Sequence, residues 1–65
     1  MEAYQQRVVD EKRELDEKRS KLGAFIGSSM FNGLPVEERN RLLRQRNAMT
    51  EYSTVLGERI EAFGK

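Results

Sequence analysis

Apolar residues recur every seven positions in the first part of the chain, at Val8, Leu15 and Leu22. A spacing of seven places side chains on one stripe of an α-helix. The stretch contains no proline, so the pattern predicts a helix over about residues 2–25. Within residues 10–21 the only apolar side chain is that of Leu15. The stripe is therefore as narrow as a coiled-coil seam.

A second stripe with the same spacing predicts a helix over about residues 35–62. Its repeating positions are Leu42, Met49, Leu56 and Phe63. We expect four further side chains to widen it, namely those of Leu43, Tyr52, Val55 and Ile60. Pro35 suits the first helical position, where a missing N–H costs nothing. Gly57 interrupts the pattern and predicts either a close helix contact or an early helix end.

A single strong break separates the two helices, over residues 27–34. Glycine, serine and asparagine gather there, and the only proline follows at once. A short connection makes consecutive helices antiparallel neighbours. We therefore expect one all-α domain over residues 1–65, a two-helix antiparallel hairpin, with Met30, Phe31 and Leu34 covering its turn end.

Charged residues make up 35% of the chain, yet the net charge is only +1. Within the first helix, Glu14 and Lys18, and Glu17 and Lys21, have the i,i+4 spacing of helix-supporting ion pairs. A balanced charge argues against a duplex nucleic-acid binder, which needs a one-signed basic face. No apolar run reaches the roughly 18 residues of a membrane span, and the polar start MEAYQQ lacks a signal-peptide layout.

The composition lacks the usual catalytic and metal-binding side chains. There is no cysteine and no histidine, which removes thiolate and imidazole chemistry. We expect no enzyme, no metal site and no cofactor. A 65-residue chain buries little surface by itself. Because disulfides are excluded and no metal-loop spacing occurs, oligomerisation is the remaining source of stability, and we expect a homo-oligomer.

Three features are candidates for ligand binding, and each of them also has a simpler structural interpretation. The ring of Tyr4 either packs over a neighbouring helix or stacks on a planar ligand such as a nucleobase. The cations at residues 18–21 either line a solvated helix face or contact phosphate. Four arginines within residues 39–46 either cover the surface with their stems or form an anion-binding ring in an assembly.

The order of helix positions resembles a family of small phage proteins, the anti-CBASS sponges. The resemblance rests on the run Tyr4-Gln5-Gln6-Arg7-Val8-Val9-Asp10-Glu11, on Leu15-Asp16-Glu17-Lys18, Leu22 and Phe25-Ile26, and on Leu42-Leu43, Gln45, Ala48-Met49, Tyr52, Leu56 and Arg59-Ile60. It implies a phage immune-evasion protein that binds cyclic dinucleotides such as cyclic GMP-AMP without cleaving them. It also implies a hexamer, ligand pockets between protomers, and a place of action in the cytoplasm of the infected bacterial host.

The resemblance also implies a ligand site. Tyr4 matches a base-stacking tyrosine, and a phosphate-contacting lysine falls on Lys18 or Arg19. Three residues near Tyr4 belong to the implied site: Gln5, Arg7 and Val8. Arg59 matches a separate anionic site that takes cyclic trinucleotides in some relatives. The alternative function is a helical protein–protein interaction module, or a phage inhibitor acting through the arginine-rich second helix.

The length of the first helix limits which residues of this implied site one chain can bring to a ligand. Tyr4 and Lys18 are 14 residues apart, about 21 Å along one helix. A cyclic dinucleotide is on the order of 10 Å across, small enough for a pocket of ~300–1,000 Å³. One chain therefore cannot bring both residues to one ligand, and we expect them to come from two chains, with antiparallel first helices.

Overall fold

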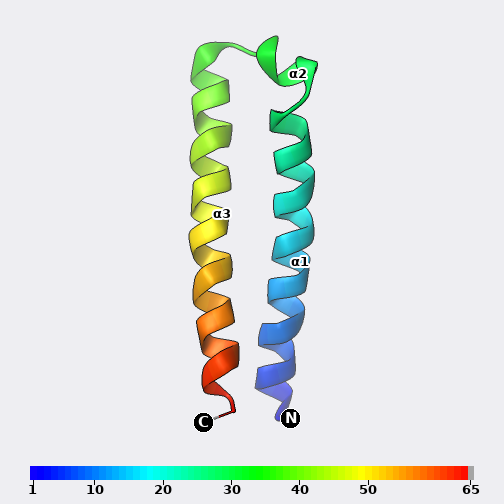
Figure 1. The fold of residues 1–65 in the computed structure, drawn as a ribbon, viewed down its shortest axis with the longest axis vertical. Coiled ribbons are helices and arrows are strands. Elements are labelled where there is room, and N and C mark those ends of the chain that lie inside the picture. Colours follow the sequence, from blue (N-terminus) through cyan, green and yellow to red (C-terminus); the bar gives the residue numbers. More distant parts are fainter. Residues whose placement is uncertain (65) are drawn as a thin grey trace.

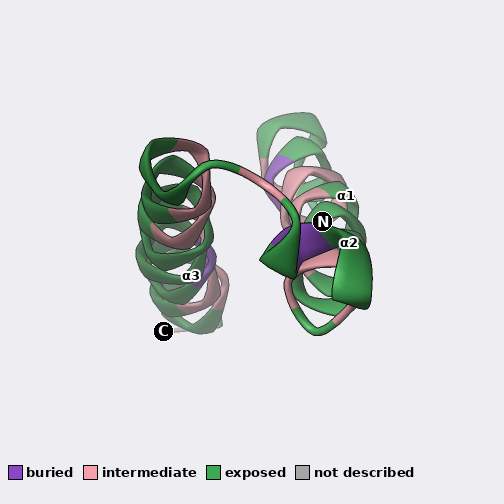
Figure 2. Cartoon of the chain, turned by 90° about the horizontal axis from the view of Figure 1, so that it is seen from above, coloured by how far each residue is buried: buried purple, intermediate pink, exposed green. Residues whose placement is uncertain are grey.

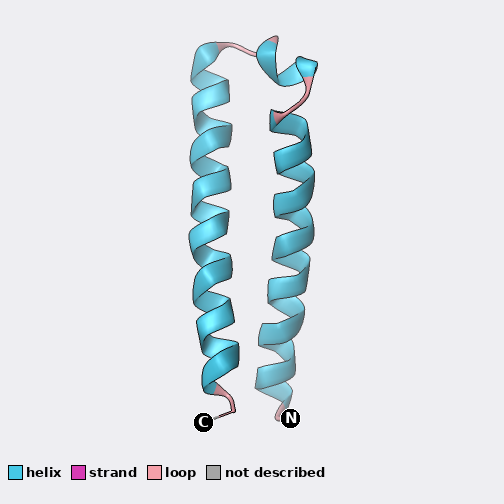
Figure 3. Ribbon diagram, viewed as in Figure 1, coloured by secondary structure: helices cyan, strands magenta, loops and turns pink. Residues whose placement is uncertain are grey.

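The computed structural model describes residues 1–64, and most of these residues lie in helices (Figures 1 and 3). They are α1 (Ala3–Ile26), the short α2 (Ser29–Asn32) and α3 (Val36–Ala62). No strand occurs within these residues, so the all-α class expected from the heptad patterns is confirmed.

The two long helices lie side by side and run in opposite directions (Figures 1 and 2). Their arrangement makes a rod of 46 × 14 × 14 Å. The N-terminus and the end of α3 share one end of the rod, and α2 lies at the other (Figure 1). A rod this thin has a single layer of side chains between its helices.

The start of each long helix follows from local chemistry. At α1 the Glu2 N–H donates to the Gln5 side-chain oxygen at 2.8 Å, which satisfies a backbone donor that the first turn leaves open. Pro35 was expected at the first helical position of α3, but it lies just outside. Its ψ of 149° is extended, and its carbonyl accepts from the backbone N–H groups of Glu38 and Arg39 at 3.1 and 3.0 Å.

The connection contains the one-turn helix α2, which the sequence pattern did not predict. α2 presents Phe31 to the interior, where its ring meets Phe25 edge to face with centroids 6.3 Å apart. Leu34 is half-buried. The expectation that Met30 also covers this end is wrong, because its neighbour in the same turn takes the inward position and Met30 is 72% exposed.

The seam between α1 and α3 follows the heptad positions. Val8 and Leu56 are buried, and Leu56 is only 1% exposed. The other heptad positions are half-buried: Leu15, Leu22, Leu42, Met49 and Phe63. Leu43 and Ile60 are also half-buried, as expected.

Two of the residues expected to widen the α3 stripe do not do so. Tyr52 and Val55 are 44% and 41% exposed. The single partner helix covers only one side of α3, and these two side chains lie on the flank that α1 does not reach. Gly57 continues the helix, and a Cβ built on it would lie 3.6 Å from the Lys12 side chain. That distance is an ordinary van der Waals contact, so the space around Gly57 does not require a glycine. The expected alternative, an early helix end, is wrong because α3 continues to Ala62.

The ion pairs of α1 also differ from the expected ones. Within residues 1–64, Glu14 and Glu17 make no ion pair with the lysines four residues on. Asp16 instead pairs with Lys12 and Arg19, each at 2.9 Å. These two cations project toward α3, where a serine hydroxyl of that helix accepts a hydrogen bond from each of them.

Candidate ligand site

Tyr4 lies in the first turn of α1 against the end of α3. Its ring meets Phe63 at 6.0 Å between centroids and an interplanar angle of 81°. Such an edge-to-face contact is a preferred aromatic geometry. Tyr4 nevertheless remains 52% exposed, so Phe63 supports the ring while leaving much of it open to a planar ligand.

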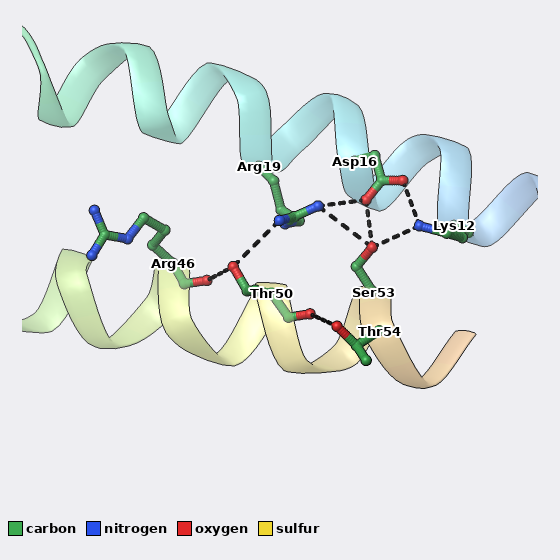
Figure 4. Close-up of polar contacts among 7 residues, drawn as sticks. All are labelled: Lys12, Asp16, Arg19, Arg46, Thr50, Ser53 and Thr54. Atoms are coloured by element: carbon green, nitrogen blue, oxygen red, sulfur yellow. Dashed lines mark hydrogen bonds and ion pairs between the residues drawn. The ribbon is translucent and has the colours of Figure 1, made fainter. Parts of the chain in front are cut away.

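A polar cluster crosses the seam near the middle of the rod (Figure 4). We call it the Asp16 cluster, and its members are Lys12, Asp16, Arg19, Thr50 and Ser53. The Ser53 hydroxyl is at its centre and is only 3% exposed as a residue. It donates to an Asp16 carboxylate oxygen at 2.6 Å and accepts from the Lys12 ammonium at 2.8 Å.

Arg19 completes the cluster from α1. Its guanidinium donates to Asp16 at 2.9 Å, to the Ser53 hydroxyl at 3.4 Å and to the Thr50 hydroxyl at 3.4 Å. Hydrogen bonds from Ser53, and then from Lys12 and Arg19, hold the pKa of Asp16 well below its ordinary value of 3.8. The carboxylate therefore stays charged, and it offsets one of the two cations that face α3.

We expect the stability of the protein to fall as the pH drops below about 4, the ordinary pKa of an aspartate. Because the folded-state pKa of Asp16 is lowered, the stabilisation from its charge is complete above the unfolded-state pKa and is lost as the pH falls toward the folded-state pKa. Urea unfolding between pH 7 and pH 2 measures this. An Asp16→Asn variant should show a weaker acid dependence than Asp10→Asn, and equal dependences would contradict the assignment.

The residues expected in the ligand site have different surroundings. Arg7 and Lys18 are exposed on α1, and within residues 1–64 neither makes an ion pair. Arg19 is held in the Asp16 cluster, Val8 is buried in the seam, and the Gln5 side chain caps α1. Arg59 is exposed in the last turn of α3.

The structure thus brings Tyr4 together with Phe63, and Arg19 together with the Asp16 cluster, but it does not bring Tyr4 and Lys18 together. They remain on one helix, about 21 Å apart along its axis.

Sequence reasoning missed Asp16, Lys12 and Ser53. A signal for two of them was present: Lys12 follows Val8 by four residues, and Ser53 precedes Leu56 by three. Both are therefore interior positions of a heptad. Polar residues at such positions on both helices indicate a polar layer within the seam.

The surface of the rod has two shallow grooves. One, of about 510 Å³, flanks the Asp16 cluster and is lined mainly from α1, with Ile60 from α3. The other, also of about 510 Å³, lies on α3 and is lined by Arg41, Arg44, Gln45 and Ala48. In the described part of the chain, no group of acidic, histidine or cysteine side chains could hold a metal ion. None of its helices is long and apolar enough to cross a membrane.

These features define a small all-helical protein that presents the ring of Tyr4 and the cations Arg7 and Lys18 on open helix faces. The chain belongs to the Sequestin family, whose family model matches residues 2–62. The family name suggests sequestering of a ligand and fits the resemblance to the anti-CBASS sponges of small phage proteins. Neither the curated proteins nor the solved structures compared with the chain include a significant match.

Proposed function

We propose that this protein sequesters a cyclic dinucleotide, without cleaving it, at a site shared by two copies of the chain. The observation that carries the proposal is the half-exposed ring of Tyr4, supported from one side by Phe63. A ring supported in this way offers a base a stacking platform, and such stacking contributes about 1–3 kcal/mol per base.

Lys18 is the cation that best complements Tyr4. The two residues are 14 positions apart on α1, which is nearly four helical turns, so they share a face within about 40°. Lys18 is exposed, whereas the Arg19 guanidinium is already hydrogen-bonded within the Asp16 cluster. Of the two cations, Lys18 is thus the better placed to contact a phosphate.

A second copy of α1, packed antiparallel, joins the two halves of the site. Residue 11 is midway between Tyr4 and Lys18. A two-fold axis near that residue brings Tyr4 of one chain level with Lys18 of the other. In such an isologous contact both copies use the same surface. The proposed function is binding alone, since no carboxylate of α1 has the full burial that tunes a catalytic acid.

A ligand panel tests this function. Cyclic dinucleotides, including cyclic GMP-AMP, are expected to raise the melting temperature, whereas matched linear dinucleotides and a single-stranded oligonucleotide are not. At about 100 µM, a hundredfold excess over a micromolar Kd, binding adds ~2.7 kcal/mol of stability. The bound ligand should be recovered intact after denaturation. Absence of any shift with every cyclic dinucleotide tested would refute the proposal.

A further inference from the structure

A second heptad pattern runs along the flank of α3 that α1 does not cover. We call it the outer stripe, and its spacing alternates between four and three residues. Its members are Arg41, Gln45, Ala48, Tyr52, Val55, Arg59 and Ala62. All seven are exposed. This alternation places side chains on one seam of a coiled coil, so the stripe has the spacing of a helix-packing surface with no helix on it.

The chemistry of the outer stripe suits another helix. Its centre is formed by Ala48, Tyr52 and Val55, one large ring among small or branched side chains. Beside Ala48 is the shallow groove lined also by Arg41, Arg44 and Gln45. Small residues permit close approach of a second helix, and a neighbouring groove accepts one of its side chains.

The charge along α3 shows which helix fits, and in which direction. The first half of the helix is net positive, with Arg39, Arg41, Arg44 and Arg46 against Glu37 and Glu38. The second half is net negative, with Glu51, Glu58 and Glu61 against Arg59. Two copies of α3 packed antiparallel place each positive half beside a negative half, whereas parallel packing places like charges together.

We propose that the outer stripe of α3 binds the outer stripe of a second copy of this chain, with the two helices antiparallel. The contact is isologous, with its two-fold axis near Tyr52, the midpoint of the stripe. It buries Tyr52 and Val55, the two large apolar side chains that α1 leaves exposed on α3 beyond its first turn.

This interface differs from the α1 interface of the proposed function, and the two together determine the assembly. Each chain then has two separate two-fold contacts, one on α1 and one on α3. Two such contacts build an even-numbered assembly, closed with dihedral symmetry when the geometry allows. A hexamer is one such assembly. This consequence rests on the proposed function, but the α3 contact itself does not.

The variant Val55→Glu tests the interface, with Thr54→Glu as its matched control. Both add one negative charge at neighbouring exposed positions of α3, but Thr54 is outside the outer stripe. By light scattering and sedimentation, Val55→Glu should lower the mass to that of two 7.6 kDa chains if the α1 contact also forms, and to that of one chain if it does not. The dissociation constant of the lost contact should rise at least tenfold. Thr54→Glu should keep the wild-type mass.

The outcomes separate this proposal from the proposed function. Circular dichroism verifies that each variant stays helical, and Ala48→Glu serves as a second stripe variant if Val55→Glu unfolds. An unchanged mass for a folded stripe variant overturns the interface, as does a monomeric or odd-numbered wild type. If the mass falls but no cyclic dinucleotide binds, the interface stands and the proposed function fails.

A distance measured between spin labels on two copies tests whether their α3 helices are antiparallel. The chain has no cysteine, so a spin label on Asn40→Cys is unique in each copy. Asn40 lies 12 residues from Tyr52, so antiparallel copies separate two labels by about 36 Å along the helix. Parallel copies keep them within about 25 Å, the scale set by helix spacing and diameter. A distance distribution without the longer component overturns the antiparallel arrangement.

Discussion

Replacing Leu56 with alanine is expected to lower the free energy of unfolding by about 2–5 kcal/mol. Leu56 is the largest fully buried side chain in the described part of the chain, at 1% exposure. Its removal leaves a cavity in a seam that is one side-chain layer thick, and few neighbours can shift to fill it. Chemical unfolding measured at one fixed protein concentration tests the prediction, because oligomer stability varies with concentration.

The matched control is Val36→Ala, which also shortens an aliphatic side chain of α3. Val36 is exposed, so its truncation should change the free energy of unfolding by no more than ~0.5 kcal/mol. Equal losses for the two variants would show that the α1–α3 seam is not the main source of stability.

Replacing Tyr4 with alanine is expected to weaken cyclic dinucleotide binding by roughly 5- to 150-fold, the equivalent of losing 1–3 kcal/mol of base stacking. The fold should survive because the ring is half exposed and lies in the first turn of α1. Isothermal titration calorimetry gives the affinity, and the solution mass should stay that of the wild type.

The conservative variant Tyr4→Phe separates stacking from hydrogen bonding. Phenylalanine keeps both the stacking face and the edge contact with Phe63, so its affinity should stay close to wild type. If Tyr4→Ala binds as well as wild type, the stacking role is wrong. Loss of affinity in Tyr4→Phe would assign the phenol hydroxyl, rather than the ring, to ligand recognition.

The parts of the fold that could be predicted from the sequence are those set by residues close together along the chain. The helices, their approximate bounds and the inward positions of Val8 and Leu56 follow from spacing along the chain. The short helix α2 was missed because a single turn has too few residues to show a period. Pro35 was misplaced by one position, since its fixed φ suits both the cap and the first turn.

Less of the candidate site could be predicted from the sequence. The ring of Tyr4 and the cation of Lys18 could be identified as candidate binding features. The support that Phe63 provides joins residues almost a whole chain length apart, and no pattern in the sequence connects them. The same is true of the contact between Asp16 and Ser53, which are 37 residues apart.

By itself, the sequence determined an all-helical chain with two long amphipathic segments and no thiol or imidazole chemistry, because periodicity and composition are local properties. The tertiary structure alone decided how far the covered face extends around each helix. From the sequence, Tyr52 and Val55 were expected to widen the stripe that contains Leu56, yet α1 buries only Leu56 of the three. A helix displays its side chains on all sides, and a single partner helix in one register can cover only one of them.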